Sequence, residues 1–219
     1  MLIEVCNLTL GYDKQKIIED ISFTVSEKDF VIVVGQNGAG KSTLIKGILG
    51  LIKPMSGSIK FGSGLNQKLI GYMPQETKVD SGFPASVNEI VLSGLINKKG
   101  FNPFYTKSDY KRVDDVLKIL NIYDIKNKSF CELSGGQRQK TLLARSLCAT
   151  DKMLILDEPS NNLDNRSREE FYLLLMKLNK ELGITIIMIS HDLDIDKMLG
   201  NKILRIFDHG YEYKEIEED

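Results

Sequence analysis

Residues 35–43 have the composition of a loop that holds phosphate groups. The sequence GQNGAGKST matches the pattern G-x-x-x-x-G-K-[ST]. Glycines let successive backbone N–H groups point at one anion. Lys41 adds a positive charge for the β- and γ-phosphates, and the Ser42 hydroxyl can bind Mg²⁺. The sequence therefore predicts a phosphate site formed by Gly35, Gln36, Asn37, Gly38, Ala39, Gly40, Lys41, Ser42 and Thr43.

The segments on either side of this loop fit the same chemistry. Residues 30–34, FVIVV, form a β-branched run that is typical of a buried strand, and residues 43–49 are expected to form a helix. A helix N-terminus carries partial positive charge, so a loop that opens a helix adds the helix dipole to anion binding. An accidental glycine-rich turn would not require these two flanks.

Two adjacent acids, Asp157 and Glu158, follow the apolar run at 153–156. An unpaired charge at the end of a buried strand is costly, and Mg²⁺ bound to Asp157, directly or through water, would offset that cost. Glu158 points elsewhere and is the candidate base that polarises an attacking water. The alternative is a pair of solvated acids at a strand end, but the phosphate loop upstream favours the metal and base roles.

Two neutral polar side chains, Gln75 and His191, also follow strand-like runs. Ligands of parallel sheets bind at the carboxyl ends of the strands, so both side chains are expected near Glu158. His191 could hydrogen-bond a γ-phosphate or the water, and Gln75 could reach Mg²⁺ or water. Taken alone, a histidine at a strand end is more often structural. The proposed role of His191 therefore depends on its expected position at the same sheet edge as Glu158.

A second helix start, Ser134-Gly135-Gly136, is also suited to an anion. Ser134 and Gln137 have the spacing of a capping box, and two small residues leave backbone N–H groups exposed. A plain helix cap would explain Ser134 but would not require two glycines. One chain with two anion-binding helix starts suggests a nucleotide held between two copies of the chain.

The elements around these residues predict an α/β fold with a mainly parallel sheet. Residues 2–10 and 17–25 alternate apolar and polar side chains, which is typical of an antiparallel sheet with one covered face. Further strands are expected at 30–34, 58–61, 68–73, 153–157, 184–189, 203–207 and near Tyr211 and Tyr213. Strands that alternate with helices around a phosphate loop indicate a parallel α/β core.

Residues 76–130 are predicted to form a helical insert. Ser86 and Glu89 form a capping box that opens a helix to about Leu95, and residues 108–120 form an amphipathic helix. The segments 76–84 and 97–107 are predicted to be loops. A last long helix is expected between Asp164, as its cap, and about Leu182.

Composition excludes several classes of protein. The chain has 219 residues and a net charge of −1, so bulk charge gives no reason to expect a nucleic-acid partner. Its three cysteines are widely spaced, so no zinc or disulfide framework is indicated. The N-terminus has a strand pattern rather than that of a signal peptide, and no apolar run approaches the about 20 residues that span a bilayer. If the protein works at a membrane, we expect another chain to supply the span.

These motifs together, in this order, resemble those of the nucleotide-binding subunit of an ABC (ATP-binding cassette) transporter. The resemblance covers essentially the whole chain, and its most specific element is LSGGQ at 133–137. The other elements are GQNGAGKST at 35–43, Gln75, LILDEP at 154–159 and His191. The resemblance implies a P-loop NTPase core, 1–75 and 150–219, with an N-terminal antiparallel β-subdomain and an inserted α-helical subdomain, 76–149.

The resemblance also implies a role for each site residue. Tyr12, which the sequence places in a turn at 11–13, would stack on adenine, and residues 35–43 would hold the phosphates of ATP. Mg²⁺ would be held by Ser42, Gln75 and Asp157. Catalysis would depend on Lys41, Gln75, Glu158 as the general base and His191 as the γ-phosphate switch residue. The nucleotide of the opposite subunit would be contacted by Ser134, Gly135 and Gly136.

One loop departs from the usual form of the family. Residues 161–164 are Asn-Asn-Leu-Asp, where Ser-Ala-Leu-Asp is more usual, and Asp164 is kept. We expect the cross-subunit contact of this loop to survive with altered hydrogen bonding. Because every catalytic element is present in one chain, a homodimer could carry two competent sites.

A finer resemblance concerns the cargo and the partners. IGYMPQ at 70–75 and FPASVNEIV at 83–91 look like the zinc/manganese/iron group of bacterial uptake ATPases, although a generic capped helix would also explain 86–91. The resemblance implies a peripheral protein at the cytoplasmic face of the cell membrane, a permease docked on 76–95, and an indirect link to a substrate-binding protein. No nucleic-acid partner is expected.

Two other functions stay open from the sequence. A soluble ABC-type ATPase without a transport role, as in iron–sulfur assembly, would have the same catalytic residues and a cytosolic scaffold as its partner. A switch that binds ATP without hydrolysing it is the third hypothesis, and the intact Glu158 and His191 argue against it.

Overall fold

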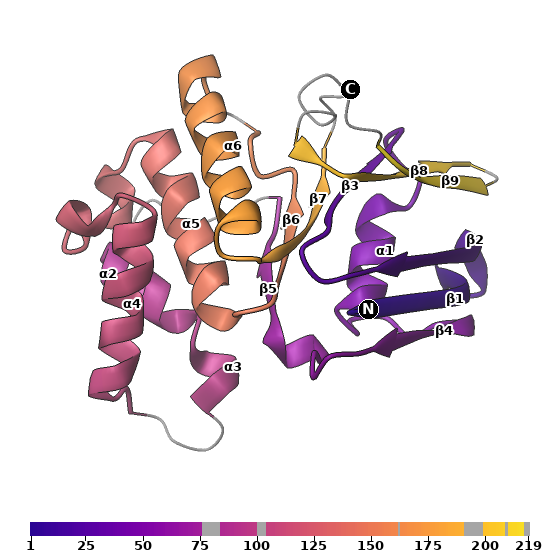
Figure 1. Cartoon of the computed structure of the whole chain (residues 1–219), viewed down its shortest axis with the longest axis horizontal. Coiled ribbons are helices and arrows are strands. Elements are labelled where there is room, and N and C mark those ends of the chain that lie inside the picture. The colour runs from indigo at the N-terminus through magenta and orange to yellow at the C-terminus, as the bar shows by residue number, and fades with distance from the viewer. Residues whose placement is uncertain (76–83, 100–103, 162, 191–198, 209, 217–219) are drawn as a thin grey trace.

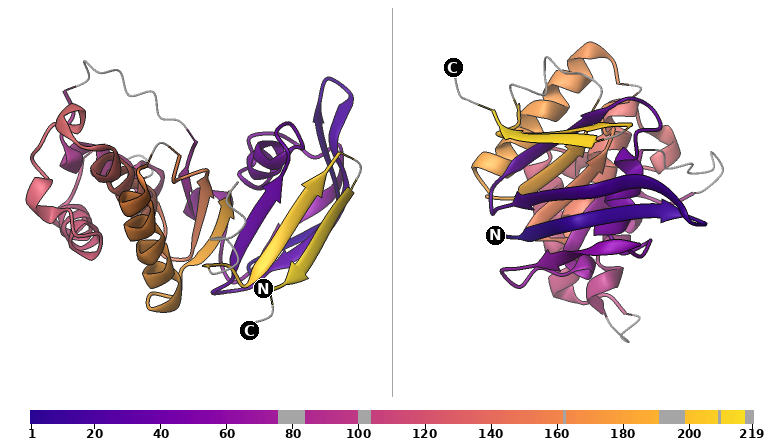
Figure 2. Two further views of the ribbon diagram at one scale, coloured as in Figure 1. Left: turned by 90° about the horizontal axis from the view of Figure 1, so that it is seen from above. Right: turned by 90° about the vertical axis from the view of Figure 1, so that its right-hand side faces the viewer.

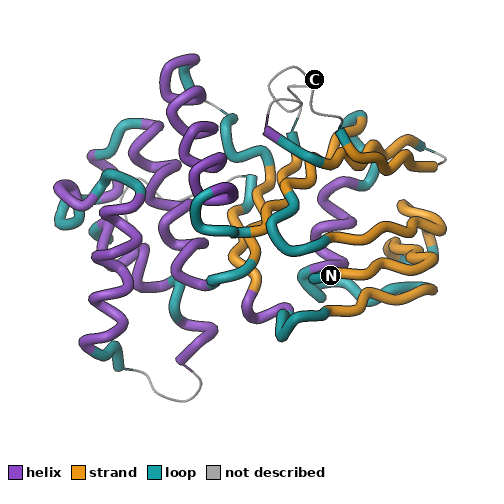
Figure 3. Tube along the Cα trace, in the orientation of Figure 1, coloured by secondary structure: helices purple, strands orange, loops and turns teal. Residues whose placement is uncertain are grey.

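The computed structural model describes residues 1–75, 84–99, 104–161, 163–190, 199–208 and 210–216 (Figure 1). Within these ranges the chain forms two sheets and a group of helices. The larger sheet has the strand order β5-β6-β7-β3-β8-β9, and the smaller sheet has the order β2-β1-β4. Most of the helices gather on one side of the molecule and most of the strands on the other (Figure 3).

The central sheet is mostly parallel, as predicted. The strands β5, β6, β7, β3 and β8 lie in that order across the sheet and run parallel to one another. Strand β9 pairs antiparallel with β8. The strands are β3 (Phe30–Gly35), β5 (Ile70–Met73), β6 (Met153–Asp157), β7 (Thr185–Ile189), β8 (Lys202–Phe207) and β9 (Gly210–Glu215). The parallel register aligns the carboxyl ends of β3, β6 and β7 at one edge.

Side chains of β3 alternate between two apolar layers, which explains why its run is apolar on every residue. Val31 and Val33 pack with α1 (Lys41–Ile48) and the smaller sheet, whereas Ile32 and Val34 pack with the helical side. The smaller sheet contains β1 (Ile3–Tyr12), β2 (Gln15–Val25) and β4 (Ser56–Phe61). Figure 2 shows the central sheet between these two layers.

The helical side is built from α2 to α6. These helices are α2 (Val87–Ser93), α3 (Ile96–Lys99), α4 (Lys107–Ile119), α5 (Gly135–Ala149) and α6 (Asn165–Lys180). Three predicted caps are confirmed, because the side chains of Ser86, Ser134 and Asp164 accept hydrogen bonds from the backbone N–H three residues ahead. No helix within the described ranges has both the length and the apolar character needed to cross a bilayer.

Arg112 on α4 binds the C-terminal end of α5, where the chain returns to the central sheet. Its guanidinium donates to the carbonyl oxygens of Leu147, Cys148 and Thr150 at 3.1, 3.1 and 2.8 Å, and it pairs with Asp151 at 2.7 Å. Carbonyl groups at a helix C-terminus lack partners within the helix, so a cation there is stabilising. The end of α5 is therefore joined to α4 just before β6 begins.

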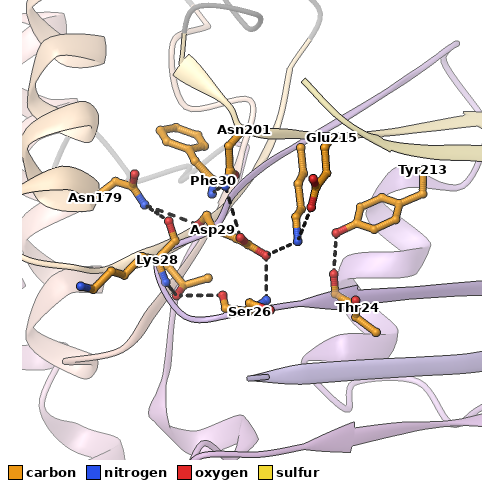
Figure 4. Close-up of polar contacts among 11 residues, drawn as sticks. Thr24, Ser26, Lys28, Asp29, Phe30, Asn179, Asn201, Tyr213 and Glu215 are labelled. Carbon is orange, nitrogen blue, oxygen red and sulfur yellow. Dashed lines mark hydrogen bonds and ion pairs between the residues drawn. The ribbon is translucent and has the colours of Figure 1, made fainter. Parts of the chain in front are cut away.

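A buried polar network lies where β3 begins (Figure 4). Asp29 accepts hydrogen bonds from the Ser26 backbone N–H at 2.7 Å and the Asn201 side chain at 3.3 Å, and it pairs with Lys202 at 3.0 Å. Asn179 of α6 donates to the carbonyl oxygen of Lys28 at 2.9 Å. Nearby, the Tyr213 hydroxyl of β9 donates to the carbonyl oxygen of Thr24 at 2.5 Å. The two sheets and α6 are thus joined at the amino-terminal end of β3.

Two local predictions were wrong. Tyr12 is the last residue of β1 and not part of a turn, because the turn is made by Asp13 and Lys14, whose φ values of 46° and 70° suit a tight hairpin. The segment 97–107 was expected to be a loop, but its first residues belong to the short helix α3. His191, Asn162 and most of the loop at 76–84 lie outside the described residues.

Candidate nucleotide-binding site

The phosphate loop connects β3 to α1, and two of its glycines have geometric reasons to be glycine. A Cβ atom at Gly35 would lie 2.4 Å from the carbonyl oxygen of Ile206 on the neighbouring strand β8. Gly40 has a φ of 100° in the position before the first residue of α1, a conformation that side chains rarely allow. The close approach and the left-handed residue together bend the chain from the strand into the helix.

The start of α1 keeps its partial positive charge. Its cap, Gly40, has no side chain to accept a backbone hydrogen bond, and no acid lies in the first turn. The first turn of α5 also lacks an acid, whereas α2 and α4 carry Glu89 and Asp109 there. An acid in the first turn would neutralise the helix dipole, so α1 and α5 differ from α2 and α4 in suiting an external anion.

Lys41 lies within the loop that it would serve. Its side chain is nearly buried, and Nζ donates to the carbonyl oxygens of Gly35 at 2.8 Å and Gln36 at 3.0 Å. Carbonyl oxygens carry only partial charge, and a phosphate oxygen would be a stronger partner for the ammonium group. This lysine is therefore positioned to exchange two neutral acceptors for an anion.

Asp157 is the last residue of β6 and is 4% exposed. Its Oδ2 lies 3.4 Å from the Ser42 hydroxyl, while within the described part of the chain its Oδ1 has no hydrogen-bond partner. Burial, and then the nearby charge of Glu158, raise the pKa of this carboxyl group. A carboxylate and a hydroxyl are hard oxygen ligands, so this pair fits Mg²⁺.

Tyr72 is a neighbour of this carboxylate that sequence reasoning missed. It lies on β5 and pairs in register with Ile155, two residues before Asp157 on the same face of the sheet. Burial and the Asp157 charge raise the pKa of Tyr72 to about 12. The strand register that brings these residues together is not visible in a single sequence.

Glu158 follows Asp157 in a left-handed backbone conformation, with a φ of 49°. Its backbone N–H donates to the carbonyl oxygen of Ile189 at 3.1 Å, which joins the ends of β6 and β7. Its Oε2 accepts hydrogen bonds from Gln75 Nε2 and Asn161 Nδ2, each at 2.5 Å. The structure therefore brings Gln75 to the candidate base, as expected for one shared edge of the sheet.

The second anion element lies at the start of α5, on the helical side of the molecule (Figure 1). Among the described residues, the hydrogen bonds of the Ser134 side chain and backbone N–H stay within its capping box with Gln137. A Cβ at Gly136 would lie 3.1 Å from the hydroxyl of Ser167, whose N–H and hydroxyl donate to Asp164 at 3.0 and 2.8 Å. The starts of α5 and α6 are thus packed together, and the Ser167 hydrogen bonds lower the pKa of Asp164.

Tyr12 and His191 complete the predicted set. The Tyr12 ring is 41% exposed at the end of β1, with Lys46 Nζ of α1 5.9 Å from its centroid. Tyr12 is therefore accessible to a partner from outside the chain. His191 lies outside the described residues, although Ser190, just before it, follows the carboxyl end of β7.

The chain is similar to known proteins along most of its length. Residues 18–161 match the family model of the ABC transporter. The zinc uptake system ATP-binding protein ZurA of Listeria innocua is 37% identical over 94% of this chain and 82% of its own length. A solved structure described as a metal-chelate type ABC transporter in an inward-facing conformation is 29% identical, with a TM-score of 0.89 over 98% of this chain and 83% of that one.

A third similarity concerns the fold. The dimeric structure of a bacterial ABC transporter cassette has a TM-score of 0.79 and 24% identity over the full length of both chains, which shows the shared fold. The family match spans more than half of the chain and contains the phosphate loop, the capped helix α5 and the acids that end β6. The chain therefore belongs to the ABC transporter family, as one of its ATP-binding, ATP-hydrolysing subunits.

Proposed function

We propose that this chain powers the uptake of a divalent metal ion, with zinc as the first candidate cargo, by hydrolysing ATP for a separate membrane permease. The observation that carries the ATPase part is the pairing of Asp157 with the Ser42 hydroxyl near the end of the phosphate loop. Asp157 is buried, and its Oδ1 has no hydrogen-bond partner among the described residues. The cargo class is supported by the name of the ZurA relative and by the resemblance of residues 83–91 to metal-ion uptake ATPases.

In this proposal Ser42, Gln75 and Asp157 would hold Mg²⁺, and the ion would neutralise charge on the phosphates. Lys41 exchanges its carbonyl partners for phosphate oxygens. Glu158 accepts a proton from water while the water oxygen bonds to the γ-phosphorus. The bond from that phosphorus to the bridging oxygen breaks, its electron pair leaves with ADP, and His191 contacts the γ-phosphate.

The second half of each site is proposed to come from another copy of the chain. Ser134, Gly135 and Gly136 would contact the γ-phosphate bound by the opposite subunit, and Tyr12 would stack on adenine within its own subunit. Support comes from the start of α5, which has no acid in its first turn, and from the dimeric relative. Closure of the two subunits on ATP and opening after hydrolysis would drive the permease.

The permease is proposed to dock on residues 76–95, at the cytoplasmic face of the cell membrane. In this division of the chain, residues 1–75 and 150–219 bind nucleotide, and residues 76–149 transmit the motion. Support comes from the position of Gln75, which contacts the candidate base and immediately precedes the docking segment.

The test uses the Glu158→Gln variant, tagged and expressed in the native cell. We expect this variant to bind ATP, to lose turnover and to accumulate a closed dimer, so a membrane extract made with mild detergent and ATP should retain a polytopic permease. Zinc uptake by cells that carry only this variant should fall to the level of cells without the chain. Recovery with a soluble scaffold instead would overturn the transport role.

A matched variant tests the phosphate loop separately. Lys41→Ala should lose ATP affinity and therefore should not form the closed dimer. Binding of ATP by Lys41→Ala with the affinity of the wild type would overturn the assignment of the phosphate site.

A further inference from the structure

The carboxylate of Glu158 is held from two directions by amide groups. Gln75 Nε2 and Asn161 Nδ2 each lie 2.5 Å from the same oxygen, Oε2. A carboxylate oxygen has two lone pairs, so two N–H donors use the acceptor capacity of Oε2. If either amide were turned over, its oxygen would face an ionised carboxylate, so the donor assignment follows from charge.

Asn161 reaches Glu158 because the chain turns between them. The Asn161 backbone N–H donates to the carbonyl oxygen of Glu158 at 3.3 Å, which closes a four-residue turn. Within that turn Pro159 is buried, and the Ser160 hydroxyl lies 2.8 Å from the Tyr172 hydroxyl of α6. The turn is therefore fastened to α6 on one side and to the candidate base on the other.

Residue 161 is one of the two places where this loop departs from the usual Ser-Ala-Leu-Asp. A serine hydroxyl is one bond from Cβ, whereas the asparagine nitrogen is two bonds away and carries two hydrogens. The longer side chain brings an N–H donor to the carboxylate of Glu158. The asparagine at position 161 therefore adds a hydrogen bond to Glu158.

We propose that Asn161 is a positioning residue that holds Oε2 of Glu158, so that Oε1 is the atom that accepts the proton of the attacking water. This inference rests on the proposed role of Glu158 as general base. A hydrogen bond to a charged group is worth more than one between neutral groups, so its loss should let the carboxylate leave its reactive orientation. ATP binding should be unaffected, because Asn161 is not part of the phosphate loop.

The test compares Asn161→Asp with Asn161→Ala in the purified full-length chain. Aspartate keeps the size of asparagine and suits a turn equally well, but it places a second carboxylate beside Glu158. We expect kcat to fall by about tenfold in Asn161→Ala and by at least as much in Asn161→Asp, with the KM for ATP within about twofold of the wild type. Size-exclusion chromatography with ATP and Mg²⁺ should show an accumulated dimer for both variants.

Ser160→Ala is the matched control, because it loosens the same turn at Tyr172 without touching Glu158. We expect it to keep the kcat of the wild type and to form no excess dimer. In a Glu158→Gln background, Asn161→Asp should add no further dimer accumulation, since the carboxylate through which it acts is gone.

The outcomes separate this inference from the proposed function. Wild-type kcat in both Asn161 variants, with an inactive Glu158→Gln, would overturn the positioning role and leave the base assignment standing. Equal losses of kcat and melting temperature in Ser160→Ala and Asn161→Asp would assign the residue to folding alone. Wild-type turnover by Glu158→Gln would overturn the proposed function itself.

Discussion

Asp29 and Asp157 are both buried at ends of central strands, yet they differ in how many polar partners the chain provides for their carboxylates. Asp29 precedes β3 and has Ser26, Asn201 and Lys202 as partners (Figure 4). Asp157 ends β6, and within the described ranges one of its oxygens has no hydrogen-bond partner. A buried carboxylate that is satisfied within the chain supports the fold, whereas one left incomplete is a candidate ligand-binding group.

The largest expected effect is on turnover. Asp157→Asn should lower kcat by about 100-fold or more, because an amide is a poorer ligand for Mg²⁺ than a carboxylate. Asp29→Asn, the same chemical change at the other end of the sheet, should leave kcat per folded molecule unchanged. Steady-state ATPase assays corrected for the folded fraction would measure both. An equal loss in the two variants would remove the distinction between the two aspartates.

The second effect is on stability and falls on Asp29. Removing one partner of a buried ion pair leaves Lys202 without its main counter-charge, at a cost of about 3 kcal/mol. For a chain of this size that corresponds to a melting temperature lower by roughly 6–12 °C. Thermal unfolding followed by circular dichroism would measure it. A variant as stable as the wild type would show that Glu215, 3.6 Å from Lys202, suffices as the partner.

Asp157→Asn should change stability in the opposite direction. The pKa of Asp157 is raised, so the folded chain holds this proton more tightly than the unfolded chain. That contribution is complete below the ordinary aspartate pKa and is lost as the pH rises through the raised value. In buffer without nucleotide or Mg²⁺, the variant should therefore melt at a higher temperature than the wild type near pH 7.

The pH dependence of that difference is its control. As the pH falls toward the ordinary aspartate pKa of about 3.9, the wild-type carboxyl in the folded chain takes up its proton, and the two melting temperatures should converge. A variant that melts below the wild type near pH 7 would mean that the Asp157 charge is compensated without a ligand.

The smallest expected effect comes from the edge of the network around Asp29. Tyr213→Phe removes only the hydroxyl that donates to the carbonyl oxygen of Thr24. The free energy of unfolding should fall by about 1 kcal/mol, with no change in kcat. Urea denaturation would measure it, and a loss of turnover in the folded variant would extend the catalytic machinery to the wrong end of the sheet.

Local patterns could be predicted from the sequence, and long-range contacts could not. The caps of α2, α5 and α6 are bonds across three residues, so the spacing of Ser86, Ser134 and Asp164 was sufficient. The phosphate loop and the acids after β6 were found for the same reason. The pairing of Asp29 with Lys202 depends on which strands become neighbours, as does the approach of Tyr72 to Asp157.

The strand order explains why those contacts were invisible. The central sheet places β3 beside β7 and β8, which lie far from it in the sequence, and the neighbouring strands β5 and β6 are separated by residues 74–152. The hydrogen bond from Asn161 to Glu158 is local, yet it depends on the left-handed conformation of Glu158, which no spacing rule predicts for a glutamate. The roles of these residues in catalysis stay predictions until they are tested.

The left-handed conformation of Glu158 also has an evolutionary consequence. Glycine and asparagine adopt a φ near the observed 49° more readily than glutamate does, and relief of such strain is worth roughly 1 kcal/mol. Substitution of Glu158 by glycine or asparagine would therefore favour stability at the expense of the candidate base. A lineage that no longer needs to hydrolyse ATP should lose this carboxylate early, while the glycines that shape the phosphate loop persist for the sake of the fold.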